Sequence, residues 1–327
     1  MPDMTSLKIV ILDRATIPTN IRMKPLLFPH SIEVFNHSDA GIVGSRMIDA
    51  DIVITNKAKI SAQEIQACSR LKLVAIAATG TDNVDVQACS ANRVAVCNIR
   101  DYAATTVPEH TFALIFALQR SLAAYRNAVN AGRWLEAGQF CFFDYPIRDL
   151  AGSKIGIVGD GVLGKATAHI AQALGMHVLM AAHKGRKEMG ALYTPFERVL
   201  SESDIITLHC PLNDSTRNLI GDAEFAQMTR RPILINTARG GLVDEFALAR
   251  ALQAGQIAGA GFDVVTQEPL PANHPFQEIL NHPGFILTPH VAWASKQAIQ
   301  TLADQLMDNI TAFVEGKPRN LVCGPFT

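Results

Sequence analysis

Three side chains suited to acid–base chemistry stand at or just beyond the ends of strand-like runs in the second half of the chain. They are Arg239, Glu268 and His290. Because the carboxyl ends of parallel strands converge at one edge of a sheet, the three groups are expected to share a pocket. Arginine can bind a carboxylate and polarise a carbonyl, histidine titrates near neutral pH, and a carboxylate beside imidazole favours its protonated form. Each residue alone is also compatible with an ordinary surface or loop role, but together they predict a catalytic site.

A glycine-rich turn lies upstream of these residues. The apolar run 154–158 leads directly into G-x-G-x-x-G at 159–164, an alanine-rich helical pattern follows, and a second apolar run occupies 177–182. In a strand, turn, helix and strand arrangement, such glycines turn the chain, admit a pyrophosphate and allow close helix–strand packing. The helix N-terminus then faces the phosphates. The pattern predicts a dinucleotide site, although a βαβ unit that merely has glycines in its turn is the plain alternative.

Strand-like and helical segments alternate along most of the chain, which indicates parallel sheets covered by helices. The expected strands outside the glycine turn are 8–13, 32–35, 51–56, 71–77, 94–97, 204–209, 232–237, 259–264 and 285–288. The last four, with the two strands beside the glycine turn, make the six of a Rossmann sheet. Thr106 and Glu109 are spaced as a capping box that begins a helix with Pro108 in its first turn. A final helix is expected from Ser295 to Gly316.

Two further segments invite a functional interpretation. Thr79 and Gly80 follow the expected strand 71–77, where backbone N–H groups could bind a carboxylate, although the segment could also be a plain turn. Aromatic residues crowd the segment 139–145. A surface segment cannot bury side chains on both of its sides, so a core or a second subunit must cover them. We favour a subunit interface, and hence a homodimer.

Composition narrows the classes of partner. The 327-residue chain has a net charge of −1 and 48% hydrophobic residues, so it is long enough for two domains and lacks the basic excess of a nucleic-acid-binding protein. No secretory signal or membrane-spanning run is evident, and a cytoplasmic protein is expected. The six cysteines form no C-x-x-C pair or metal-ligand spacing, which predicts reduced thiols and no metal site.

Four motifs in this order resemble those of the D-isomer-specific 2-hydroxyacid dehydrogenases. They are the central glycine turn, Ile235–Glu245 with the sequence INTARGGLVDE, the segment from Asp263 to Pro269, and PHVAW from Pro289 to Trp293. The resemblance covers nearly the whole chain and implies an α/β protein of two domains, both with doubly wound parallel sheets. A flavodoxin-like substrate domain would comprise residues 1–103 and 293–327, and a Rossmann cofactor domain residues 104–292.

The resemblance also implies residue roles. Arg239 would bind substrate and polarise its carbonyl, His290 would be the acid/base, and Glu268 would be its partner. Thr79 and Gly80 would bind the substrate carboxylate, and Trp293 could lie beside the substrate side chain or pack in the domain hinge. The residues expected to contact the cofactor are Thr106, Gly159, Gly161, Val162, Leu163, Gly164, His183, Lys184, Arg186, Cys210, Pro211, Thr216, Thr237, Ala238, Asp263 and His290.

One position departs from the family pattern. NAD-dependent members usually end the second cofactor-domain strand with an acidic residue that binds the ribose hydroxyls. This chain has His183 there, followed by Lys184, Arg186 and Lys187. With cations present and no acid to repel a 2′-phosphate, NADP is favoured over NAD, unless this basic loop points away from the ribose.

The resemblance is strongest to hydroxypyruvate reductases, also called glycerate dehydrogenases, and implies NAD(P)-dependent reduction of hydroxypyruvate or glyoxylate to the D-2-hydroxy acid, and the reverse. Closure of two domains over the substrate would exclude water. A dinucleotide-sensing corepressor of the same fold is an alternative, disfavoured because the chain has no extra tail. Formate or phosphite oxidation is another, and an extended N-terminal region like that of formate dehydrogenases is not evident.

Overall fold

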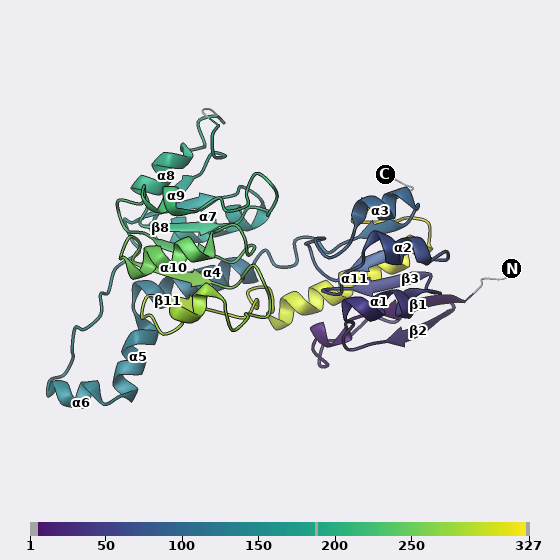
Figure 1. Ribbon diagram of the computed structural model, residues 1–327, viewed down its shortest axis with the longest axis horizontal. Coiled ribbons are helices and arrows are strands. Elements are labelled where there is room, and N and C mark those ends of the chain that lie inside the picture. The colour runs from purple at the N-terminus through teal and green to yellow at the C-terminus, as the bar shows by residue number, and fades with distance from the viewer. Residues whose placement is uncertain (1–5, 187–188, 325–327) are drawn as a thin grey trace. The chain divides into compact units, whose positions relative to one another are not determined.

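The computed structural model describes residues 6–186 and 189–324, and Lys187 therefore lies outside the described residues. The chain divides into two units, Met1–Tyr102 with Ala294–Thr327, and Ala103–Trp293. Each unit is built on its own six-stranded sheet (Figure 1).

The sheet of the first unit has the strand order β12-β5-β4-β3-β1-β2. Apart from β12, this is the flavodoxin-like order. Its elements are β1 (Leu7–Ile11), β2 (His30–Val34), β3 (Ile52–Thr55), β4 (Leu73–Ile76), β5 (Ala95–Cys97) and β12 (Leu321–Cys323), with α1 (Ala40–Met47), α2 (Ala62–Ala67), α3 (Val86–Ala91), α11 (Lys296–Val314) and the 3₁₀ turn η1 (Arg14–Thr16). Strand β12, which the sequence analysis did not predict, pairs antiparallel with β5. The other strands were predicted correctly.

The sheet of the second unit has the order β11-β10-β9-β8-β6-β7, and all of its pairings are parallel. Its strands are β6 (Lys154–Val158), β7 (His177–Met180), β8 (Ile205–Leu208), β9 (Ile233–Asn236), β10 (Gly259–Phe262) and β11 (Phe285–Leu287). Its helices are α4 (Thr106–Gln119), α5 (Leu122–Asn130), α6 (Arg133–Ala137), α7 (Val162–Ala173), α8 (Phe196–Glu202), α9 (Asp222–Phe225), α10 (Glu245–Gln253) and the 3₁₀ turn η2 (Pro275–Glu278). The six predicted strands are confirmed, and Thr194 adds a one-residue bridge to Ala181 beyond β7.

The two predicted helix starts had different outcomes. Ser295 caps α11 as expected, because its hydroxyl accepts a hydrogen bond from the Ala298 N–H at 3.1 Å. The capping box at α4 was wrong: Thr105 is the residue before the helix, and no side chain caps it. Thr106 already lies inside the helix, so its hydroxyl cannot take the cap position and instead donates to the Ala292 carbonyl at 3.1 Å.

The segment 120–148 forms an arm that contains α5 and α6 and extends from the rest of the second unit (Figure 1). Within the arm, Tyr125 packs against Phe142 and Tyr145 with ring centroids 5.3 Å apart in each pair. The other aromatic side chains are not covered: Phe140 is 89% exposed and Phe143 85% exposed. Of the crowded aromatics, Phe142 and Tyr145 therefore pack within the arm, whereas Phe140 and Phe143 are left uncovered.

All six cysteines are unpaired, and four of them are buried. Among the residues that the structure describes, no helix is both long and apolar enough to cross a membrane.

Candidate active site

The glycine turn joins β6 to α7, and each of its glycines has a different environment. A Cβ on Gly159, which has φ +111°, would lie 2.6 Å from the His209 carbonyl carbon, and one on Gly164 would lie 1.9 Å from the Gly159 oxygen. Both positions therefore require glycine for packing within the protein. A Cβ on Gly161 would meet open space, and no side chain caps the helix that starts beside it. Open space before an uncapped helix N-terminus is what a pyrophosphate group needs, so these residues fit a dinucleotide.

The adjacent strand β8 ends at the point where the strand order reverses, which is where open α/β sheets bind ligands. His209 follows this strand, and its ring nitrogen Nε2 lies 3.0 Å from the Thr207 hydroxyl. Burial lowers the pKa of His209 to about 4, so its imidazole is neutral near pH 7. Burial also raises the pKa of the Cys210 thiol to about 11, which keeps it protonated. The Thr216 hydroxyl donates to the Pro211 carbonyl at 2.7 Å and holds the following loop.

The loop that carries Arg239 is held from two sides. The Asn236 side chain donates to the Arg239 carbonyl at 2.8 Å and accepts from the Ala238 N–H at 3.1 Å. On the other side, a Cβ on Gly240 would lie 2.1 Å from the Val265 carbonyl carbon, so the loop presses against the backbone that leads to Glu268. Thr237, at the start of this loop, has its hydroxyl 3.0 Å from that of Thr111 on α4.

His290 and Glu268 are in direct contact, with Nδ1 of the ring 2.7 Å from Oε2 of the carboxylate. Since that contact places the imidazole proton on Nδ1, the remaining nitrogen Nε2 can exchange a proton with a substrate. Both side chains are partly exposed, at 25% for His290 and 35% for Glu268. The Trp293 indole donates to the His290 carbonyl at 2.9 Å and so fixes the backbone next to the ring.

Asp263 anchors the segment that carries His290. It is 1% exposed, and its two oxygens accept hydrogen bonds from the N–H groups of Val291 at 2.9 Å and Ala292 at 2.8 Å. The Thr288 hydroxyl donates to the same carboxylate, and Nε2 of His110 lies 3.0 Å from that hydroxyl. These bonds fix the Asp263 carboxylate beside the histidine segment, and the expected contact of Asp263 with the cofactor stays a prediction.

A second buried network supports the segment that carries Glu268. Glu245 accepts a hydrogen bond from the Thr266 N–H at 2.7 Å and contacts Nε2 of His274 at 2.8 Å. Nδ1 of His274 accepts from the Phe276 N–H, so the ring proton must be on Nε2, where it donates to Glu245. No role was predicted for His110, Glu245 and His274. Glu245 ends the INTARGGLVDE motif, but its partner His274 lies 29 residues further along the chain in no motif, and neither does His110.

In the first unit, Thr79 and Gly80 follow β4. The Thr79 hydroxyl donates to the Ile99 carbonyl at 2.7 Å, and the Asn98 side chain donates to the Thr79 carbonyl at 2.8 Å. Among the described residues, the backbone N–H groups of Thr79 and Gly80 have no hydrogen-bond acceptor. They are therefore free to bind an anion.

The basic residues after β7 have different environments. Lys184 forms an ion pair with Glu224 at 2.8 Å, and its ammonium group also donates to the Leu219 carbonyl. Glu224 in turn accepts from the Gly221 N–H at the start of α9. His183 and Arg186 are exposed. Lys184 is thus engaged by a carboxylate, and of the cations in the described part of this segment, His183 and Arg186 are the better candidates for a 2′-phosphate.

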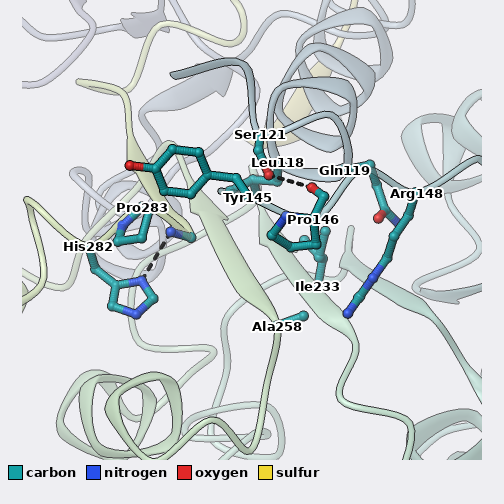
Figure 2. Close-up of a pocket in the computed structure, with 11 residues that line it drawn as sticks. Leu118, Gln119, Ser121, Tyr145, Pro146, Arg148, Ile233, Ala258, His282 and Pro283 are labelled. Carbon is teal, nitrogen blue, oxygen red and sulfur yellow. Dashed lines mark hydrogen bonds between the residues drawn. The ribbon is translucent and has the colours of Figure 1, made fainter. Parts of the chain in front are cut away.

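A small cavity of about 120 Å³ lies at the opposite edge of the second sheet, beside the starts of β9 and β11 (Figure 2). Gln119, Arg148 and His282 are among its lining residues, and the Gln119 side-chain oxygen is buried without a hydrogen-bond partner. The cavity lies at the amino ends of these strands, whereas His290 follows the carboxyl end of β11, so the cavity is separate from the candidate active site. In the described part of the chain, no three His, Cys, Asp or Glu side chains gather as a metal site would require.

A Rossmann sheet that carries a glycine turn, with an arginine, a glutamate and a histidine after its strands, is typical of a dinucleotide-dependent enzyme. Residues 112–292 match the family model "D-isomer specific 2-hydroxyacid dehydrogenase, NAD binding domain". The chain is 48% identical to a glycerate dehydrogenase of Methylorubrum extorquens over 96% of this chain and 98% of that protein. It is 35% identical to a hydroxypyruvate reductase of Blautia hydrogenotrophica, over 97% and 99% respectively.

Among solved structures, the chain resembles a D-lactate dehydrogenase from Aquifex aeolicus in complex with NAD and lactic acid. The TM-score is 0.83 at 25% identity, with 97% of this chain and 99% of that one covered. The protein belongs to the D-isomer-specific 2-hydroxyacid dehydrogenase family.

Proposed function

We propose that the enzyme reduces a small 2-keto acid, with hydroxypyruvate and glyoxylate preferred, to the D-2-hydroxy acid, and catalyses the reverse reaction. The observation that carries this proposal is the 2.7 Å contact between His290 and Glu268 at the strand ends of a dinucleotide-binding sheet. The names of the two relatives support this choice of substrate. A panel of 2-keto acids assayed with NADPH and NADH tests it directly. If none of them were reduced, the proposal would be wrong.

The residues divide the chemistry between them. When bound, the reduced nicotinamide supplies the hydride that adds to the carbonyl carbon. Arg239 binds the substrate carboxylate and polarises the carbonyl, and Nε2 of His290 gives the carbonyl oxygen its proton. Glu268 stabilises the imidazolium before that transfer. In the oxidative direction the same ring takes the hydroxyl proton.

We assign the two units different tasks. Residues 104–292 would bind the cofactor, and residues 1–103 with 293–327 would form the substrate domain. The free N–H groups of Thr79 and Gly80 suit a substrate carboxylate. The cysteines, which are all unpaired, are typical of a reducing compartment, and on that basis we place the enzyme in the cytoplasm.

Trp293 is expected to limit substrate size. Trp293→Ala should raise kcat/KM for branched keto acids relative to hydroxypyruvate, because removing the indole opens space next to the His290 segment. Trp293→Phe is the control, since it loses the hydrogen bond to the His290 carbonyl but keeps a ring. If Trp293→Ala slowed all substrates equally, the indole would only hold the backbone.

NADPH is expected to be preferred over NADH. Arg186 offers positive charge and His183 a ring donor for a 2′-phosphate, and a phosphate paired with arginine is stabilised by charge-assisted hydrogen bonds. The ratio of kcat/KM for NADPH over NADH should exceed one, fall as salt is added, and drop in Arg186→Ala. Arg198→Ala, which removes an exposed arginine paired with Glu202, is the control and should leave the ratio unchanged. A wild-type preference for NADH would contradict the expectation.

We further propose that the arm 120–148 mediates a homodimer. Leu135, Phe140 and Phe143 are each at least 85% exposed, and such a cluster is typical of a subunit interface. Sedimentation at micromolar concentration should show a dimer, and replacing Phe140 and Phe143 together by serine should yield monomers. Leu27→Ser is the matched control, because Leu27 is 91% exposed but lies in the first unit. A monomeric wild type would refute the proposal.

A further inference from the structure

An acidic residue lies inside the glycine turn, where the motif itself leaves the residue type open. Asp160 stands between Gly159 and Gly161, and its Oδ2 accepts a hydrogen bond from the Tyr193 hydroxyl at 2.5 Å. This bond lowers the pKa of Asp160 and raises that of Tyr193, and the nearby positive charge of Lys165 and of protonated His183 lowers the pKa of Asp160 further. Asp160 is therefore ionised at neutral pH.

The backbone places Tyr193 at this position. The adjacent Thr194 bridges the end of β7, because its N–H donates to the Met180 carbonyl at 2.7 Å and its carbonyl accepts from the Ala182 N–H at 2.8 Å. Tyr193 is thereby fixed beside the C-terminal end of β7. In a Rossmann sheet, the ends of the first two strands flank the adenosine ribose. Asp160 extends from the first of these strands and Tyr193 lies beside the second.

We propose that Asp160, oriented by Tyr193, is a specificity-determining residue for the adenosine ribose. It would accept a hydrogen bond from a ribose hydroxyl of NADH and repel the 2′-phosphate of NADPH. Asp160 in the glycine turn would thus take the place of the acidic residue that NAD-dependent relatives usually have at the end of β7. Selectivity is then a balance in which Asp160 favours NADH, whereas His183 and Arg186 favour NADPH.

The inference rests on the proposed function only in that a dinucleotide binds at the glycine turn. It does not depend on which cofactor the wild type prefers, because it concerns the direction in which Asp160 shifts that preference. A different role for the same residues would be structural: the Tyr193 bond could do no more than hold the turn in place. In that case both cofactors would lose affinity together.

The test measures binding by the whole enzyme, without turnover. The dissociation constants of NADPH and NADH are determined by fluorescence titration for the wild type, Asp160→Asn and Tyr193→Phe. Asp160→Asn should lower the ratio of the NADPH to the NADH dissociation constant by about five- to tenfold, the size expected for one unit charge acting over several ångströms of solvent. The shift should shrink at high salt. Tyr193→Phe should move the ratio in the same direction but less, because the carboxylate keeps its charge and loses only its orientation.

Asp149→Asn is the matched control, because Asp149 is an exposed carboxylate that pairs with Arg120 at the base of the arm. It should leave the ratio unchanged. If Asp160→Asn weakened both cofactors by the same factor, or changed neither, the specificity role would be refuted. If the wild type bound both dinucleotides but reduced no keto acid, the proposed function would be refuted. The ratio of the two dissociation constants would still test the role of Asp160.

Discussion

His290→Ala is expected to lower kcat for keto-acid reduction by about 10²- to 10⁴-fold, the usual contribution of a positioned acid–base group. The dissociation constant of the dinucleotide should change little, because the glycine turn is untouched. Steady-state kinetics and fluorescence titration of one preparation measure both quantities. His177→Ala is a control, since His177 is an exposed histidine at the start of β7.

Glu268→Gln should give a smaller loss in kcat than His290→Ala. The amide can still contact Nδ1 of His290 but no longer stabilises the imidazolium by charge, and hydrogen bonds to charged groups contribute about 1.5–3 kcal/mol. Combining both substitutions should slow the enzyme little more than His290→Ala alone, because Glu268 acts through the ring. Near-normal turnover in His290→Ala would show that another group is the acid.

Two alanine substitutions in the glycine turn should have opposite consequences. Gly161→Ala should leave the melting temperature of the cofactor-free protein unchanged, because the added Cβ meets open space and φ is already −69°. It should weaken dinucleotide binding by roughly tenfold or more, about 1.4 kcal/mol, if the pyrophosphate occupies that space. Gly164→Ala should destabilise the protein itself by about 1–3 kcal/mol, because its Cβ would lie against the Gly159 carbonyl.

Gly41→Ala is the control for both. Gly41 lies in α1 of the first unit, and its added Cβ also meets open space. Thermal melts with and without NADH or NADPH separate the two effects. If Gly161→Ala kept full affinity, the pyrophosphate would not pass over this residue.

Periodicity and strand-end chemistry predicted the sheets because the central strands, such as β3, β4, β8, β9 and β10, are short apolar runs buried on both faces. Strand β12 escaped prediction because it follows the last helix and pairs antiparallel, outside the alternation of strands and helices from which the other strands were predicted. Its partner β5 is more than 200 residues away in sequence. The start of α4 was placed wrongly because Thr106 fits the local capping pattern, whereas its actual acceptor, the Ala292 carbonyl, is distant in the chain.

The candidate site was predicted only in part, for a similar physical reason. Arg239, Glu268 and His290 stand at strand ends, so topology alone brings them to one edge. The groups that hold them, such as Glu245 at the start of α10 with His274, come together through the path of the chain between them, which a linear pattern does not encode. Likewise, the ion pair of Lys184 with Glu224 could not be inferred from a run of basic residues.

The hydrogen bond between Thr106 and Ala292 bears on where the second unit could be separated from the rest of the chain. It joins the third residue after Ala103 to the residue before Trp293, so the second unit begins and ends at nearly the same place. A polypeptide of residues 103–293 would therefore have adjacent termini, as in modules inserted into a host domain. It would carry the glycine turn, Arg239, Glu268 and His290 together. The segment is therefore suited to exchange between related enzymes in chimeric proteins.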